Sequence, residues 1–150
     1  MPVSKDESIR FLKFAFVGIS GTIIDFGIFN LLFQRLGITD ELAKVISFSV
    51  AVFNNFFWNR IWTYPEAKST PFLKQMGKFL IVSLIGLGIN VIIFSSSKNI
   101  LINFADMFFP PDFMINSSVI GKNLSVALAT IVVLFWNYLA NRFWTFKTII

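Results

Sequence analysis

The chain of 150 residues contains no cysteine and no histidine, and charged residues make up only 14% of it. Without cysteine the protein has no disulfide framework, no thiolate nucleophile and no cysteine-based metal site. Without histidine it also lacks the usual metal ligand and the usual general base near neutral pH. We therefore expect no bound metal and no cofactor, and we do not expect an enzyme, because a nucleophile–base or acid–base pair is missing.

Apolar residues dominate what is present: hydrophobic side chains make up 55% of the sequence, and 20 residues are phenylalanine. A water-soluble chain of this size has too high a surface-to-volume ratio to bury so much apolar surface. Four apolar stretches, over about 11–34, 42–62, 78–98 and 119–143, are each close to the ~20 residues that cross a hydrocarbon core. The sequence predicts an all-α membrane protein, with residues 1–150 forming a single transmembrane domain of four helices.

The first apolar stretch is longer than a signal-peptide core and no small-residue cleavage site follows it, so we expect it to be retained. The third stretch is followed by an apolar segment, 99–118, which includes the Pro110-Pro111 pair. We expect this segment either to extend the third helix or to lie at the membrane interface.

The distribution of lysine and arginine predicts how the four stretches are oriented. Four of these residues fall on one side: Arg35, Lys44, Lys98 and Lys122. Nine fall on the other: Lys5, Arg10, Lys13, Arg60, Lys68, Lys74, Lys78, Arg142 and Lys147. We therefore expect a multi-pass protein of the cytoplasmic (inner) membrane with both termini in the cytoplasm. The net charge of +5 does not indicate nucleic-acid binding, because the basic residues lie between apolar runs and not on one soluble face.

The sequence contains an internal repeat, over 11–64 and 76–146. Lys13-Phe14, Val17, Gly21 and Ile24 recur at an offset of 65 residues (78 − 13), which places Asn90 at the position of Asp25. A second signature, N-x-x-x-N-R-x-W-T-aromatic, begins at Asn55 and recurs at Asn137, an offset of 82 (137 − 55). Each copy holds two stretches, so the two helical hairpins form a parallel repeat and both signatures are predicted to end on the cytoplasmic side.

An aspartate inside the first stretch is the most unusual polar residue. Asp25 lies about 17 Å into that stretch at ~1.5 Å per residue, near the middle of a bilayer, where a charge costs on the order of 3 kcal/mol. We expect it to have a functional role, with a hydrogen bond to Asn90 or Thr22 as the purely structural alternative. Small residues in the odd-numbered stretches predict close helix approach, and they are Gly18, Gly21, Gly27, Gly86 and Gly88.

The repeated signatures supply the other candidate site residues. Within each copy the two asparagines are four residues apart and share a helix face, and they are Asn55 and Asn59, then Asn137 and Asn141. Arg60 and Arg142 follow, and their planar guanidinium groups match phosphate oxygens. The alternative role of the asparagines is interhelical hydrogen bonding, and that of the arginines is anchoring to ordinary lipid phosphates. The tryptophans of the protein all belong to these ends, and Trp62 and Trp144 are candidates to stack on a sugar. A belt of tryptophans that only anchors the protein would lie at both membrane interfaces, so their gathering on one side favours a binding site there.

The sequence resembles the GtrA-like family of small four-span membrane proteins. The resemblance is carried by the run from Phe11 to Gly18, by Thr22 and Asp25-Phe26-Gly27, and by the two N-R-x-W-T-aromatic ends. It implies a role in glycosylation of cell-surface polysaccharide, in which a polyprenyl-phosphate-linked sugar is flipped across the membrane after a glycosyltransferase has loaded the lipid. The family's motif positions are occupied here by Asp25, Asn55, Asn59, Arg60, Asn137, Asn141 and Arg142.

Three functions follow from these features. The first is a flippase that binds the anionic lipid head at the asparagine–arginine ends and passes it by Asp25 and Asn90. The second is a membrane scaffold that recruits a glycosyltransferase and has no need of Asp25. A small drug/proton exporter ranks below both, because it does not need duplicated phosphate-binding arginines. The predicted partners are the sugar lipid, membrane lipids, a glycosyltransferase and a second copy of the chain.

Overall fold

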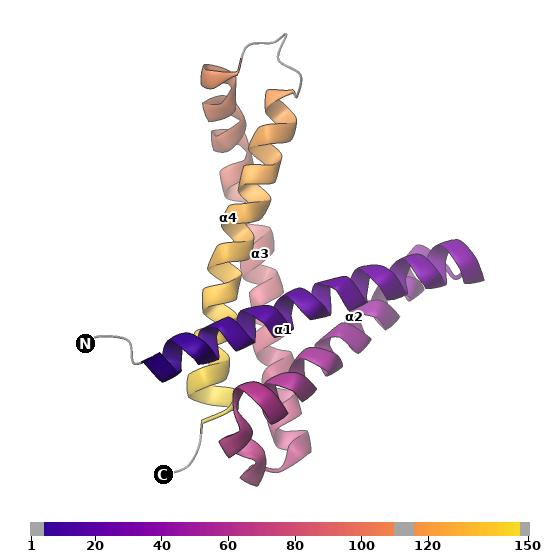
Figure 1. Ribbon diagram of the computed structural model, residues 1–150. Helices are drawn as coiled ribbons and strands as arrows, with labels where there is room; N and C mark the ends of the chain where they lie inside the picture. The colour runs from indigo at the N-terminus through magenta and orange to yellow at the C-terminus, as the bar shows by residue number, and fades with distance from the viewer. Residues whose placement is uncertain (1–4, 110–115, 148–150) are drawn as a thin grey trace. The chain divides into compact units, whose positions relative to one another are not determined.

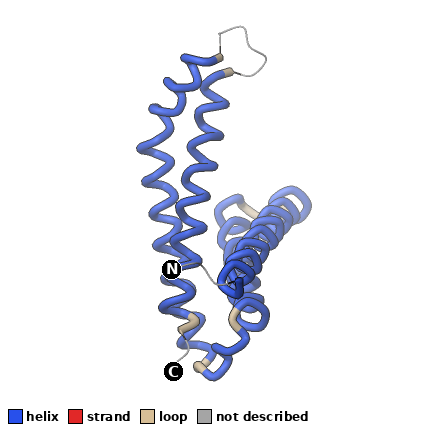
Figure 2. Tube along the Cα trace, turned by 60° about the vertical axis from the view of Figure 1, so that its left-hand side comes forward, coloured by secondary structure: helices blue, strands red, loops and turns tan. Residues whose placement is uncertain are grey.

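The computed structural model describes residues 5–109 and 116–147. Its α-helices are α1 (Lys5–Asn30), α2 (Asp40–Trp58), α3 (Phe72–Phe108) and α4 (Ser117–Ala140) (Figure 1). Figure 2 shows helices joined by loops, with no strand in the part of the chain that the structure describes. The prediction of an all-α protein is confirmed.

Three of the helices continue into π-helical turns, in which a backbone N–H bonds to the carbonyl five residues earlier. The turns cover Leu31–Arg35, Asn59–Thr63 and Asn141–Thr145. A short 3-10 helix, Pro65–Ser69, follows the second turn. Between α1 and α2, Gly37 has a φ of 63°, a left-handed conformation that glycine adopts without steric cost.

Within the described residues, three helical segments are long and apolar enough to cross a membrane: Asp6–Arg35, Phe72–Phe108 and Ser117–Thr145. α2 is not among them, because Lys44 near its start and two asparagines near its end make it more polar. Lys44, which the charge count assigned to the side with fewer basic residues, lies in the first part of α2. Four spans and cytoplasmic termini stay predictions.

The third helix is longer than its predicted stretch of 78–98. α3 runs without a break from Phe72 to Phe108, so residues 99–108 extend the helix, which is one of the two arrangements expected for that segment. Residues 110–115, with the Pro110-Pro111 pair, lie outside the described residues.

The chain divides into two compact units, and the first comprises residues 1–80 and 141–150. In this unit α1 packs along α2, with Phe14 and Val17 of α1 buried. Another stripe of α1 is apolar and 61–71% exposed, with residues at spacings of three or four: Leu12, Phe16, Ile19, Ile23 and Phe26. A helix with its apolar stripe on the outside is stable when its solvent is lipid.

The core of the first unit is aromatic. Phe56 of α2 is fully buried and its ring contacts those of Phe72, Phe79 and Phe146 at centroid distances of 5.1–6.2 Å. Tyr64 stacks on Phe146 at 4.7 Å with 14° between the planes. Tyr64 and Phe146 are the aromatic residues that end the two signatures, so both copies of the repeat contribute to one core.

The second unit comprises residues 81–140, in which α3 packs along α4 through small residues. Ala105, Ser125 and Ala129 are at most 1% exposed. A Cβ added to Gly121 would lie 2.5 Å from the backbone nitrogen of Ile102, so only glycine allows the two backbones to approach this closely.

The predicted role of glycine in close helix approach holds at two positions and is wrong at three. A Cβ added to Gly21 or Gly86 would collide with an asparagine side chain. No neighbouring atom lies within 4 Å of a Cβ added to Gly18, Gly27 or Gly88. Those three glycines lie on parts of their helices where the structure places no partner close by.

Candidate functional site

The two signature ends adopt the same backbone geometry. In each copy the second asparagine begins a π-helical turn: the amide of Tyr64 donates to the carbonyl of Asn59, and the amide of Phe146 donates to the carbonyl of Asn141, both at 2.8 Å. Asn59 is 2% exposed and Asn141 is 1% exposed. π-helical turns recur at functional sites because the extra residue redirects side chains. Here the asparagine and the threonine of each turn are buried, whereas the tryptophan just before the threonine is exposed, 39% at Trp62 and 44% at Trp144.

A lysine from the start of each repeat copy holds the tryptophan of the signature. Lys13 Nζ donates to the Trp62 carbonyl at 3.4 Å and lies 5.4 Å from the centre of that indole ring. Lys78 makes the same contacts with Trp144, at 3.2 and 5.5 Å. Neither lysine was among the predicted site residues. The signal that identifies them is their position, because each begins a Lys-Phe pair that opens a copy of the repeat.

Each guanidinium of the two signatures is bound by protein acceptors. Arg60 donates to the carbonyls of Lys68 and Thr70, each at 2.9 Å, and to Oε1 of the buried Gln75; its guanidinium also lies 5.6 Å from the ring centre of Phe72. It therefore ties the 3-10 segment to the start of α3.

Arg142 is bound at a different place. Its Nη2 lies 2.9 Å from Oε1 of Glu7 at the start of α1, and its Nε also donates to that carboxylate. The two guanidinium groups thus serve separate acceptors. A phosphate shared between Arg60 and Arg142 stays a prediction, and it would require both sets of contacts to be exchanged.

The first asparagine of each signature faces a glycine of the neighbouring helix. A Cβ on Gly21 would lie 2.6 Å from Asn55 Cγ, and a Cβ on Gly86 would lie 2.8 Å from Asn137 Oδ1. Asn55 Oδ1 is buried and has no hydrogen-bond partner among the described residues. The amides are therefore packed between helices at repeat-equivalent positions, one within each unit.

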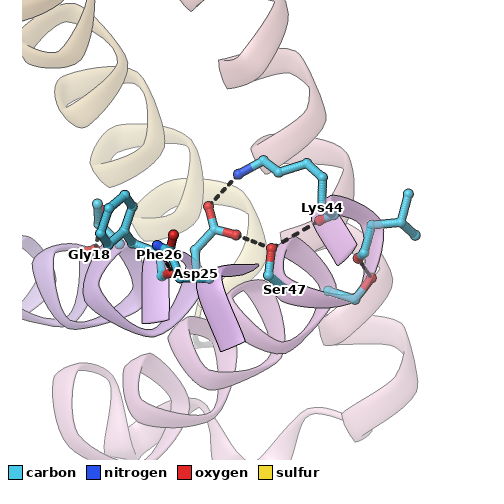
Figure 3. Close-up of polar contacts among 9 residues, drawn as sticks. Gly18, Asp25, Phe26, Lys44 and Ser47 are labelled. Atoms are coloured by element: carbon cyan, nitrogen blue, oxygen red, sulfur yellow. Dashed lines mark hydrogen bonds and ion pairs between the residues drawn. The ribbon is translucent and has the colours of Figure 1, made fainter. Parts of the chain in front are cut away.

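Asp25 has two partners on α2 that the sequence interpretation did not identify (Figure 3). Its Oδ2 lies 2.6 Å from Nζ of Lys44, and its Oδ1 accepts a hydrogen bond of 2.6 Å from Ser47. The Asp25 side chain is 22% exposed and that of Lys44 is 57% exposed. Thr22, one of the two expected partners, instead donates to the Gly18 carbonyl at 3.2 Å. We name Asp25, Lys44 and Ser47 the polar triad.

The polar triad belongs to the first hairpin alone. Asn90, the other expected partner of Asp25, lies half-buried on α3 in the second unit. The repeat offsets of 65 and 82 place Asn90, Val126 and Ala129 at the three positions of the triad. The second copy therefore has an amide at the position of the carboxylate and apolar residues at the positions of its two partners.

A groove of about 400 Å³ lies between α1 and α2. Its walls are largely apolar and aromatic, and its lining residues are Phe16, Val17, Ser20, Ile24, Asn54, Trp58 and Trp62. Asn54 Nδ2 is buried and has no hydrogen-bond partner among the described residues. Trp62 is fixed by Lys13 and by the edge of Phe16, whose ring centre is 5.9 Å away. The groove therefore combines apolar walls with an amide donor and two indole rings.

A smaller, charged pocket of about 220 Å³ lies at the end of this groove and shares Trp62 with it. Its charged lining residues are Asp6, Arg10, Lys13 and Glu66. Arg10 and Glu66 form an ion pair at 2.6 Å. The groove and the pocket together join an open apolar surface to a charged helix end, which suits a molecule that is part lipid and part polar headgroup.

Comparison with known proteins places the chain among membrane domains. The family model for the GtrA/DPMS transmembrane domain matches residues 13–146. A dolichol-phosphate mannosyltransferase of Pyrococcus furiosus is 38% identical over 88 residues, which are 59% of this chain and 25% of that protein. The uncharacterized membrane protein YngA of Bacillus subtilis is 27% identical over 145 residues, or 96% of this chain and 84% of the relative. The chain thus spans a quarter of the first relative and most of the second.

Proposed function

Because the chain belongs to the GtrA/DPMS transmembrane-domain family, we propose that it moves a polyprenyl-phosphate-linked sugar across the cytoplasmic membrane for glycosylation of cell-surface polysaccharide. In this proposal both termini lie in the cytoplasm and the lipid is loaded by a glycosyltransferase. The chain itself carries out no covalent step. A second copy of the chain, or the glycosyltransferase, covers the exposed faces of the helices.

The observation that carries the proposal is the groove between α1 and α2. A polyprenyl tail needs apolar walls, whereas the group attached to its phosphate needs hydrogen-bond donors and acceptors that survive in a low dielectric. The groove supplies both, because its apolar walls surround Asn54 and Ser20 and its end adjoins a charged pocket. Lys13 is held beside Trp62, the residue shared by the groove and the pocket, and it provides a cation for the phosphate that joins the lipid to the sugar.

The polar triad provides an intermediate polar binding site for the headgroup as it crosses the membrane. Asp25 and Lys44 form an ion pair between α1 and α2, so both charges are compensated while no substrate is present. A passing phosphate can attract Lys44 and sugar hydroxyls can donate to Asp25, which would exchange one set of charged contacts for another. Intramembrane charged groups are expensive and characteristically mark such pathways.

A reconstituted transport assay tests this function. The purified protein is incorporated into liposomes that contain a fluorescent polyprenyl-phosphate hexose, and the lipid's movement between leaflets is measured with a membrane-impermeant quencher. We expect Asn54→Leu, which removes the amide from the groove, to lower the rate at least tenfold. The control, Phe53→Leu, changes a neighbouring residue that is 47% exposed and does not line the groove. Equal rates in protein-containing and empty liposomes would refute the proposal.

The alternative function is that of a membrane anchor that recruits a glycosyltransferase. It is favoured by the dolichol-phosphate mannosyltransferase, in which the segment similar to this chain is part of a longer protein. An anchor needs the folded domain but neither the groove nor the polar triad. If Asn54→Leu leaves surface glycosylation in cells unchanged, and deletion of the whole protein abolishes it, the anchor explains the result better.

A further inference from the structure

The charged pocket at the end of the groove has a composition that does not match a phosphate site. Its charged residues are two carboxylates, Asp6 and Glu66, and two cations, Arg10 and Lys13, so their formal charges cancel. A phosphate group would be favoured by an excess of positive charge and disfavoured by two adjacent carboxylates. A polyol, in contrast, carries no charge and needs both hydrogen-bond donors and hydrogen-bond acceptors.

The ion pair in the pocket leaves much of its hydrogen-bonding capacity available. A guanidinium carries five N–H donors and a carboxylate has about four acceptor positions. Arg10 Nη1 contacts Glu66 Oε1 at 2.6 Å, and the two side chains are 28% and 32% exposed. The ion pair therefore fixes the orientation of both groups while part of each still faces the pocket. Such preorganised charged groups bind hydroxyls without a large loss of side-chain entropy.

Two further residues suit a sugar ring. Trp62 is 39% exposed, lines both the pocket and the groove, and is held by contacts with Lys13 and Phe16. A fixed indole presents an apolar surface to the C–H groups of a pyranose. Thr63, which is 2% exposed, also lines the pocket, and its hydroxyl oxygen has no hydrogen-bond partner in the described part of the chain.

We propose that this pocket binds the sugar of the lipid-linked substrate and that it selects a single neutral monosaccharide. The inference rests on the proposed function, and it assigns the sugar to the pocket and the lipid to the groove. The volume of about 220 Å³ is below the range of about 300–1,000 Å³ for pockets that hold drug-sized ligands, which suits one ring and not an oligosaccharide. A sugar acid is disfavoured because Arg10 and Lys13 are already balanced by Asp6 and Glu66, so a further carboxylate would give the pocket a net negative charge.

Three synthetic lipids with the same short prenyl chain test the assignment. They are the bare prenyl phosphate, the prenyl-phosphate hexose and the prenyl-phosphate hexuronic acid, and binding to the purified full chain in nanodiscs is measured by calorimetry. We expect the hexose lipid to bind at least tenfold more tightly than the bare phosphate and than the uronic acid lipid. The double variant Asp6→Asn/Glu66→Gln should lower the ratio of hexose affinity to bare-phosphate affinity about tenfold, as the loss of charge-assisted hydrogen bonds predicts.

The affinity for bare prenyl phosphate serves as the internal control. In the double variant it should stay the same or increase, because the helix end becomes more basic. Asp6→Asn alone keeps the ion pair of Arg10 with Glu66 and should lower the ratio by a smaller factor, and Asp106→Asn in the second unit should leave it unchanged. Circular dichroism and thermal unfolding check that each variant is folded.

The outcomes separate the pocket from the proposed function. Binding of bare phosphate with no preference for the hexose lipid, or an equal loss of both affinities in the double variant, overturns the pocket assignment and leaves the lipid-transport proposal in place. A preference for the uronic acid lipid also overturns it. If no prenyl phosphate binds at all, the pocket assignment and the proposed function fail together.

Discussion

Three substitutions would replace the polar triad of the first hairpin by the residues that the second hairpin carries at the equivalent positions. Asp25→Asn, Lys44→Val and Ser47→Ala reproduce Asn90, Val126 and Ala129. The second hairpin shows that α-helices of this repeat pack with those residues, so the triple variant tests the function of the charges while it preserves the fold. The repeat itself supplies a natural template for a neutral triad.

The magnitudes follow from the contacts of Asp25. Lys44→Val alone removes the ion pair at 2.6 Å. Of its two partners in the triad, the Asp25 carboxylate then keeps Ser47. An uncompensated Asp at the centre of a membrane helix costs about 2.5–3.5 kcal/mol, so we expect a loss of stability of about 2–3 kcal/mol. The triple variant contains no charge at these positions and loses hydrogen bonds worth about 0.6 kcal/mol each, so it should lie within about 1 kcal/mol of the wild type.

Two assays decide the outcome. The free energy of unfolding is measured by titration with SDS in mixed micelles, followed by tryptophan fluorescence, and translocation is measured in liposomes. We expect the triple variant to be nearly as stable as the wild type and at least tenfold slower in translocation. Wild-type translocation by the triple variant would refute a role for the triad. A single variant as stable as the triple variant would refute the compensation of Asp25 by Lys44.

Two further predictions concern packing. Gly121→Ala places a methyl group 2.5 Å from the backbone nitrogen of Ile102 and should lower the free energy of unfolding by about 1–3 kcal/mol. Gly18→Ala, with open space around it, should be neutral or stabilising in the same SDS titration. Equal effects of the two variants would contradict the packing of α3 on α4. Arg60→Ala removes the donors that join Gln75 and the 3-10 segment, so limited proteolysis should cut residues 65–71 at least several times faster than in the wild type, and an unchanged cleavage rate would contradict this role.

Several features could be predicted from the sequence because they depend on local or repeated patterns. Apolar composition predicts helices whose solvent is lipid, and the structure shows three segments that can span a membrane. The signature around Arg60 and Arg142 predicts that two equivalent helix ends exist, and both form the same π-helical turn. The same signature predicts the family, because residues at a fixed, short spacing can be recognised in a single sequence without a structure.

What only the tertiary structure decided is the partner of each charged side chain. Lys44 entered the sequence analysis only as a charge on one side of the membrane, because no local pattern shows that the turn between α1 and α2 returns it to Asp25. Arg142 pairs with Glu7, which is 135 residues away in the chain, and such a contact leaves no periodic signal. A charge in sequence is a property of one residue, whereas its compensation depends on which helix faces lie opposite each other. The groove and its charged end follow from that packing, and so does the place where a headgroup would bind.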